Sequence, residues 1–299
     1  MGEMATETTG STVPRRQLGR YLRELRSGQR ITVKTAAEKL EWSEAKIWRI
    51  ETGQTSLRSL DVEAMCRIYA APPDLTEALM GLAKETKAKG WWHAYGDVIP
   101  EGFDVYIGLE EATSLLSMYQ SELVPGLLQT EDYARTVIKA GKPDEDDEQI
   151  DRLVHVRIAR QALIRRPTAP LELRAALNEA VIRRPVGGSA IMAAQLDRLA
   201  ETAEMPNVSV RVVPFRAGLH HGVMSGPFYI LRFPLNGDGQ ESEPATVYVN
   251  GFTGDLYLDK TREVERFADA FEHIWGAALD EHASRDLIHR SAEELRQCP

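Results

Sequence analysis

The sequence predicts two folds in one chain: an all-α N-terminal domain, followed by an α+β domain with a mixed, largely antiparallel sheet and helices. Length is the first reason, because 299 residues exceed the roughly 100–200 that are usual for one domain. Patterning is the second, because apolar residues recur at helical spacing up to residue 90, whereas β-branched segments appear after residue 109. Charge is the third reason. Residues 1–58 hold eleven Lys and Arg against seven Asp and Glu, but residues 91–299 hold 21 against 33.

The N-terminal domain is expected to consist of five helices after a Thr-, Gly- and Ser-rich start, residues 1–13, that we expect to be disordered. Leu18, Leu22 and Leu25 share one face of the first helix, which ends near Gly28. Ser59 is expected to cap the fourth helix. The remaining helices are predicted over residues 31–40, 43–53 and 74–88.

The stretch from Ser43 to Gly53 predicts a short helix that offers a polar face. Ser43 can cap its first turn, Ile47 and Ile50 point toward a core, and Gly53 permits the left-handed residue that ends it. Only Glu41 and Trp42 separate this helix from the preceding one. Two helices joined by so short a turn fit the major groove of B-DNA, which is about 12 Å wide. The alternative interpretation, without DNA binding, is a capped helix in an ordinary helical bundle.

The order of these residues, A-A-x-x-L followed by S-x-x-x-I-x-x-I-E-x-G, resembles the XRE (Cro/C1-type) helix-turn-helix family of DNA-binding regulators. The resemblance implies a DNA-binding domain over residues 14–90. It implies base contacts from Ser43, Glu44, Ala45, Lys46 and Arg49. It implies phosphate contacts from Thr32, Lys34, Trp48, Gln54 and Arg58.

Two positions depart from that family, since Val33 and Glu44 stand where many members carry glutamine. Arg49 is then the best direct reader, because a guanidinium can donate two hydrogen bonds to guanine, and Lys46 fits a phosphate contact better. A single short reading helix suggests a homodimer on a palindromic double-stranded operator. The acidic remainder of the chain would be repelled by phosphate.

An aromatic connector is expected over residues 91–108, with Trp91 and Trp92 packing it against the second domain rather than stacking on bases. An α+β domain is expected over residues 109–299. Strands are predicted within residues 113–126, 171–177, 208–215, 227–233 and 246–252. Helices are predicted at 130–141, 147–166, 189–203, 261–279 and 284–296. The adjacent late strands suggest antiparallel pairing.

Four segments of this second half, LVPGLLQTEDYAR, RIARQALI, NEAVIRRPVGG and VRVVPFRAGLHHG, resemble the C-terminal domain of actinobacterial XRE-type regulators of the WhiJ-like, antitoxin-like set. The resemblance implies that this domain receives a small partner protein or an unknown ligand, and we expect it also to dimerise. Two alternatives remain open: an antitoxin-like protein that neutralises the product of a neighbouring gene, and a one-component regulator that senses a small molecule.

Nothing in the sequence favours an enzyme, a cofactor or a metal site. His220 and His221 would point to opposite faces of a strand, and no glycine-rich phosphate loop is present. The acidic run 144–148 is expected to be a solvated loop or a docking site for a basic partner, and VPGLLQT a core segment or a partner groove.

The two cysteines predict no disulfide framework: Cys66 is expected in a core and Cys298 as a free thiol. No apolar run reaches the roughly 18 residues of a membrane span, so we expect a cytoplasmic protein with no membrane contact.

Overall fold

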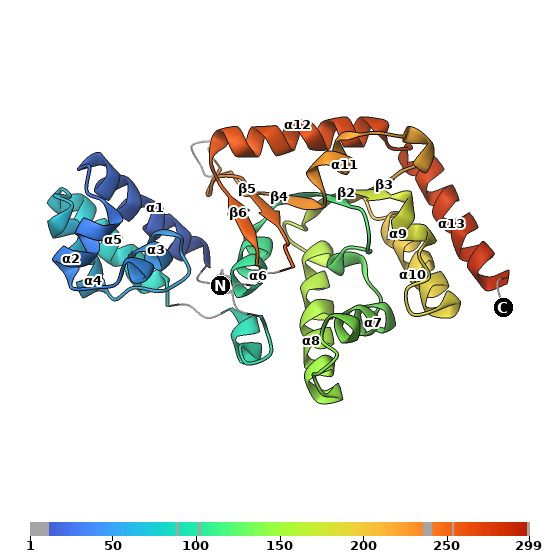
Figure 1. Ribbon diagram of the computed structural model, residues 1–299, viewed down its shortest axis with the longest axis horizontal. Coiled ribbons are helices and arrows are strands. Elements are labelled where there is room, and N and C mark those ends of the chain that lie inside the picture. Colours follow the sequence, from blue (N-terminus) through green and yellow to red (C-terminus); the bar gives the residue numbers. More distant parts are fainter. Residues whose placement is uncertain (1–11, 88–89, 101–102, 236–240, 253, 298–299) are drawn as a thin grey trace, which may run out of the picture. The chain divides into compact units, whose positions relative to one another are not determined.

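The computed structural model describes residues 12–87, 90–100, 103–235, 241–252 and 254–297 (Figure 1). The chain forms two compact units. Unit 1 consists of Met1–Gly96 and Pro100–Ala112, and unit 2 of Asp97–Ile99 and Thr113–Pro299. Residues 1–11 of the expected disordered start and Cys298 lie outside the described residues, whereas Thr12 and Val13 already belong to the first helix. The expected domain limits stay a prediction.

Unit 1 is helical, and its core is built from the apolar faces of its first five helices. Leu18, Leu22, Ile47 and Ile50 are almost fully buried there, as is Cys66. The helices are α1 (Thr12–Gly28), α2 (Val33–Leu40), α3 (Glu44–Glu51), α4 (Ser59–Ile68), α5 (Pro73–Glu85) and α6 (Phe103–Ala112), with a 3-10 turn η1 (Trp91–Tyr95).

The expected cap at Ser59 is wrong. Arg58 occupies the N-cap position of α4 and makes no side-chain cap. The Ser59 hydroxyl instead donates to the carbonyl of Met80, 3.2 Å away, because it faces α5 rather than the free N–H groups of its own first turn. This hydrogen bond joins α4 to α5.

The aromatic connector supplies part of the interior of unit 1. Trp92 is 1% exposed, and its ring closes over Gly108 on α6, where Thr12 of α1 also packs. Trp92 is therefore a core residue of unit 1 rather than a base-stacking platform, and its expected packing against the second domain stays a prediction.

Unit 2 contains a six-stranded mixed sheet of strand order β3-β2-β1-β4-β5-β6. The β1–β2 and β2–β3 pairs are parallel, and the three remaining pairs are antiparallel, as expected for the late strands. The strands are β1 (Leu115–Gln120), β2 (Glu172–Asn178), β3 (Val208–Val213), β4 (Phe228–Arg232), β5 (Thr246–Val249) and β6 (Leu256–Leu258).

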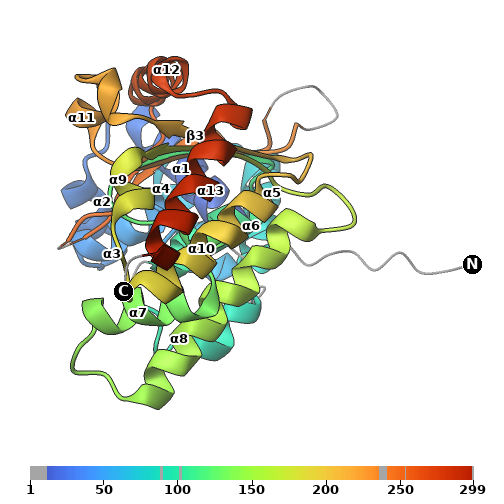
Figure 2. The same cartoon turned by 90° about the vertical axis from the view of Figure 1, so that its right-hand side faces the viewer.

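Helices cover both faces of this sheet. The helices are α7 (Glu131–Gly141), α8 (Asp147–Arg160), α9 (Glu179–Arg183), α10 (Ser189–Thr202), α11 (His221–Ser225), α12 (Thr261–Ala277) and α13 (Glu281–Gln297), with 3-10 turns η2 (Gly126–Leu128), η3 (Gln161–Arg165) and η4 (Phe215–Ala217). Figures 1 and 2 show α12 on one face and α7, α8 and α10 on the other. On the α12 side, Phe228 and Val247 of the sheet pack with Phe271 and Ile274.

Of the two interpretations of the VPGLLQT segment, the structure favours the core segment. Val124, Leu127 and Leu128 are at most 3% exposed. Gln129 donates to the Val124 carbonyl at 2.7 Å, and Gln195 of α10 donates to the Leu128 carbonyl at 2.8 Å. These bonds satisfy the backbone groups of a buried turn.

Within the described residues, none of the helices is long and apolar enough to span a bilayer.

Candidate nucleic-acid interface

The two helices of the predicted motif begin at side-chain caps. Thr32 caps α2 by accepting from the Thr35 N–H at 3.1 Å, and Ser43 caps α3 by accepting from the Lys46 N–H at 3.2 Å. Glu41 takes the left-handed conformation between them, with φ +56°. The chain therefore turns sharply from one helix into the next and leaves the start of α3 exposed.

The outward face of α3 is formed by Ala45, Trp48 and Arg49. Residues three and four apart lie on one side of a helix, so these three share a stripe opposite the buried Ile47 and Ile50. The Trp48 side chain is 54% exposed. This surface holds Ala45 and Arg49, which were expected to read bases, and Trp48, which was expected to contact phosphate. Ser43 and Glu44, two further expected base readers, are exposed at the start of the helix.

Lys46 lies on the flank of this face and has a partner of its own. Its ammonium nitrogen sits 3.3 Å above the centre of the Trp42 ring. A cation held on an aromatic face keeps its charge and loses much of its freedom of movement. The positive charge of Lys46 is therefore fixed next to the start of α3, where the helix dipole is also positive.

The expected phosphate-binding residues other than Trp48 are spread over three places in the chain. Thr32 and Lys34 are exposed at the start of α2, Gln54 is exposed just after α3, and Arg58 precedes α4. Arg58 is paired through its Nε with Asp61 at 3.1 Å, although 76% of its side chain remains exposed. Their roles stay predictions.

The far end of α3 is anchored by an ion pair that the sequence analysis missed. Arg26 of α1 donates from Nε and Nη2 to the two carboxylate oxygens of Glu51 at 2.6 and 2.7 Å, and from Nη1 to the Ile31 carbonyl at 2.8 Å. The two side chains are 12% and 5% exposed. Hydrogen bonding to Glu51 raises the pKa of Arg26. The sequence signal for this buried ion pair was Glu51, because it follows the inward-facing Ile47 by one helical turn and therefore lies on the buried side of α3.

Gly53 ends the helix segment as expected, with φ +73° after the cap residue Thr52. A Cβ atom at this position would lie 2.6 Å from Cγ of Arg16 and 2.7 Å from its Cα. The close approach of α1 therefore requires glycine for a second reason besides the backbone conformation.

His220 and His221 do not lie on a strand, so the expectation of a strand at these two residues is wrong. Gly218 and Gly226 both have positive φ and bracket a short helix, α11. Nδ1 of His220 caps α11 by accepting from the Gly222 N–H at 3.1 Å, and His221 stacks on His273 of α12 with ring centres 4.4 Å apart. Burial, followed by the charge of His221, lowers the pKa of His220.

Metal ligands do not gather in the part of the chain that the structure describes: no group of three or more His, Cys, Asp and Glu side chains is placed to hold an ion there. The expectation that unit 2 is not an enzyme stays a prediction.

Unit 2 does present a run of exposed apolar side chains. Phe215, Leu219, Val223 and Met224 are 60%, 79%, 58% and 79% exposed. They lie within ten residues, on η4, α11 and the turn between them. Exposed apolar side chains that gather in this way are typical of interaction sites.

Comparison with known families gives two matches. A helix-turn-helix domain family matches residues 17–79, which include α2 and α3 with their caps. A second family, described as a domain of unknown function, DUF5753, matches residues 103–290, well over half of the chain. The chain belongs to the DUF5753 family. The helix-turn-helix match confirms that part of the expected resemblance. The DUF5753 match begins at Phe103, the first residue of α6, and runs through the sheet of unit 2.

Comparison with curated proteins and with solved structures gave no match.

Proposed function

We propose that this DUF5753 protein is a sequence-specific DNA-binding transcription regulator, and that α3 reads its operator. The observation that carries the proposal is the anchored helix. The C-terminal end of α3 is held in place by Glu51 and Gly53, while Ala45, Trp48 and Arg49 face solvent. A helix that is already held in its binding position loses little conformational entropy on binding, so more of the interaction free energy appears as affinity.

Arg49 is proposed to bind a guanine edge and Lys46 a phosphate. The two roles differ in what they do to sequence preference. A base contact discriminates one base pair from the others, whereas a phosphate contact strengthens binding to every sequence and adds to its salt dependence.

The test begins with selection of duplexes from a random library, followed by anisotropy titrations of the full chain at several salt concentrations. Arg49→Ala should cost about 1–3 kcal/mol at one base pair and remove the preference there. Lys46→Ala should weaken all duplexes alike and lower the salt slope by about 0.9. Lys39→Ala is the matched control, because this exposed lysine lies at the end of α2 and is not among the expected DNA contacts.

If no duplex binds at low salt, the proposal that this protein binds DNA through α3 is wrong. An equal loss on all sequences in Arg49→Ala would instead make Arg49 a phosphate contact. We further propose that the protein acts as a homodimer on two half-sites, since one short helix reads few base pairs.

For unit 2 we propose that it receives a small partner protein, and that the exposed run from Phe215 to Met224 is the contact. The specific observation favouring a protein over a metabolite is the exposed run itself, because an open apolar surface is typical of protein interaction sites. The pocket beside it, lined in part by Arg216, Leu287 and Arg290, holds about 260 Å³.

Co-expression with the products of the genes on either side of this one, followed by affinity capture of the full chain, tests this role. Leu219→Ser should reduce the recovered partner several-fold. Leu235→Ser is its control, because Leu235 is 67% exposed in unit 2 but outside this run. Stabilisation of the full chain by a metabolite, with no partner recovered, would favour the ligand-sensing alternative instead.

A further inference from the structure

Trp48 is the most exposed of the five tryptophans in the chain, and it lies on the face of α3 that is proposed to meet DNA. Its side chain is 54% exposed, whereas Trp92 and Trp275 are 1% and 9% exposed. Trp42, in the turn before α3, is half-buried, and its ring carries the ammonium group of Lys46. The ring of Trp48 makes no ring or cation contact with any residue that the structure describes. A partner that covers this large apolar side chain therefore gains free energy.

The neighbours of Trp48 on the surface of α3 are an apolar residue and a carboxylate. Residues three and four apart share one side of a helix, which places the exposed Ala45 and Glu44 next to Trp48. Lys46 is two residues away and does not face Trp48. A phosphate at Trp48 would therefore meet the negative charge of Glu44 rather than the positive charge of Lys46. The phosphate contact that the family resemblance implies for Trp48 is electrostatically unfavourable for this reason.

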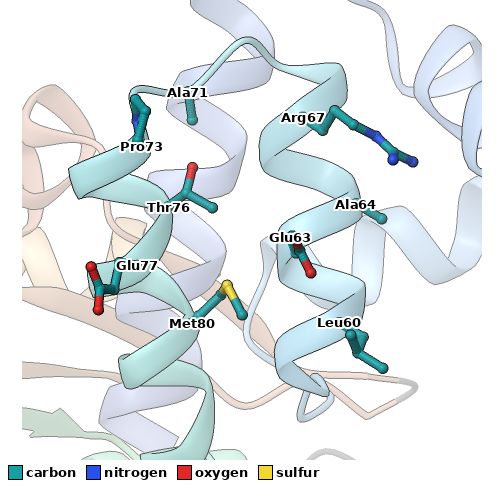
Figure 3. Close-up of a pocket in the computed structure, with 9 residues that line it drawn as sticks. All are labelled: Leu60, Glu63, Ala64, Arg67, Ala71, Pro73, Thr76, Glu77 and Met80. Carbon is teal, nitrogen blue, oxygen red and sulfur yellow. The ribbon is translucent and has the colours of Figure 1, made fainter.

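The surface around Trp48 is not shaped for a small molecule. Sites for small molecules are concave and enclose most of the ligand. The pocket of about 560 Å³ in unit 1 is lined by residues of α4, α5 and the turn between them, and Trp48 is not among them (Figure 3). Ala45 and Trp48 instead stand on the outward side of a helix, which fits into a groove of the partner.

The major groove of DNA offers one apolar group to such a side chain. All four bases present hydrogen-bond donors or acceptors there, but thymine also presents its C5-methyl group. Contact with a donor or acceptor would leave that polar group without a partner, whereas contact with the methyl group does not. We propose that Trp48, with Ala45 beside it, covers the C5-methyl group of a thymine in the operator. This inference rests on the DNA binding by α3 proposed above, and it adds a second specificity-determining residue to Arg49.

Trp48 and Arg49 then read different chemical groups of the operator. Arg49 donates hydrogen bonds to a guanine edge in the role proposed above, whereas Trp48 covers a methyl group. 5-Methylcytosine carries the same methyl group at the same ring position as thymine. The group that Trp48 recognises is therefore a C5-methylated pyrimidine, and methylation of a cytosine at this position should strengthen binding.

The test compares the selected operator with duplexes in which one thymine at a time is replaced by deoxyuridine. This replacement removes a methyl group and keeps every hydrogen-bonding group of the base pair. Anisotropy titration of the full chain should show a loss of affinity of about fourfold at the contacted thymine, the effect of one methyl group leaving a buried apolar contact. At the same position, a 5-methylcytosine·guanine pair should bind about fourfold more tightly than a cytosine·guanine pair.

Variants of the protein assign this preference to Trp48. Trp48→Ala should bind the thymine and deoxyuridine duplexes nearly equally, because the methyl group then has lost its partner. Trp48→Leu, which keeps an apolar side chain, should retain part of the preference. Leu60→Ala is the matched control: Leu60 is 71% exposed in unit 1 but lines the pocket of Figure 3, so this variant should keep the full preference. Circular dichroism checks that each variant is folded.

Failure of this inference can be told apart from failure of the proposed function. A wild type that selects an operator but distinguishes thymine from deoxyuridine at no position overturns the methyl contact and leaves DNA binding in place. A preference that persists in Trp48→Ala assigns the contact to another residue and also overturns the inference. An equal loss on all duplexes in Trp48→Ala makes Trp48 a backbone contact instead. A wild type that binds no duplex overturns the proposed function and this inference together.

Discussion

Helices α3 and α11 are both short, both begin at a side-chain cap and both are followed by a glycine with positive φ. They differ in what fixes them. A buried, hydrogen-bonded charge pair ties α3 to α1, whereas α11 rests on the ring of Tyr119 and on a stack of two imidazoles. The chain therefore has one helix held by a buried charge pair, and one held by ring contacts and capped by His220, a histidine whose pKa is lowered by burial.

The largest expected effect comes from breaking the anchor of α3. Glu51→Ala leaves the guanidinium of Arg26 mostly buried and without its carboxylate, which should cost about 3–5 kcal/mol of unfolding free energy. Urea titration of the full chain, followed by circular dichroism, measures the loss in the helical unit. Glu44→Ala, at the exposed start of the same helix, should change stability by no more than about 0.5 kcal/mol. Equal costs for the two variants would mean that α3 is not anchored through Glu51.

The corresponding change in α11 should be smaller. Gly222→Ala would put a Cβ atom 2.4 Å from Cζ of Tyr119, a buried ring that has little room to move. Overpacking of this kind costs about 1–3 kcal/mol. Val223→Ala, on the exposed side of α11, is the control and should be nearly neutral. A neutral Gly222→Ala would show that α11 lifts freely from the sheet.

Removing the cap of α3 should cost about 1 kcal/mol, because Ser43→Ala removes the side-chain acceptor of the Lys46 N–H and leaves it only the Ser43 carbonyl. The same denaturation measures it, and Ser43→Asn, which can still accept, should restore most of the stability. If asparagine gave no recovery, the hydroxyl of Ser43 would be acting in some other way than as a cap.

The smallest effect is the pH dependence of α11. The folded pKa of His220 is lowered, so the unfolded chain binds more protons in the range just below the usual histidine pKa of about 6.5. This histidine therefore contributes stability at neutral pH that is lost as the pH falls through that range, and protonation of Nδ1 also removes the cap. His220→Asn keeps an acceptor and does not titrate. Melting temperatures at pH 7.5 and 5.5 should differ less in the variant than in the wild type; an equal difference would exclude His220 as the source.

The sequence was sufficient where contacts are local. Ser43, Ile47, Ile50 and Gly53 lie within eleven residues, and each has a role that follows from helix geometry alone, so the cap, the inward face and the end of α3 were all predictable. Most strands and helices of unit 2 were placed for the same reason, since each has its own periodicity.

Contacts between distant segments were not predictable. Nothing near Glu51 indicates that Arg26, 25 residues earlier, is its partner. The alternation of apolar and polar residues along a strand indicates which face is buried, but not which strand lies next to it. The parallel pairing of β1 with β2 was therefore missed. Strand β6 has three residues, too few for a period of two to stand out. The HHG segment forms a helix rather than a strand because the glycines on either side of it set the limits of α11, a role that its own periodicity does not reveal.

The strand order also has a consequence for biosynthesis. Strand β1 lies between β2 and β4, so the middle of the sheet is incomplete until residue 232 has left the ribosome. The helices of unit 1 are complete at residue 112, and helical units generally fold fast. At the usual 5–20 residues per second, the nascent chain holds a finished α3 for roughly ten seconds before its sheet can close. During that interval the growing polypeptide presents α3, the helix that we propose to face DNA, while the sheet of the second unit is still incomplete and open to chaperones.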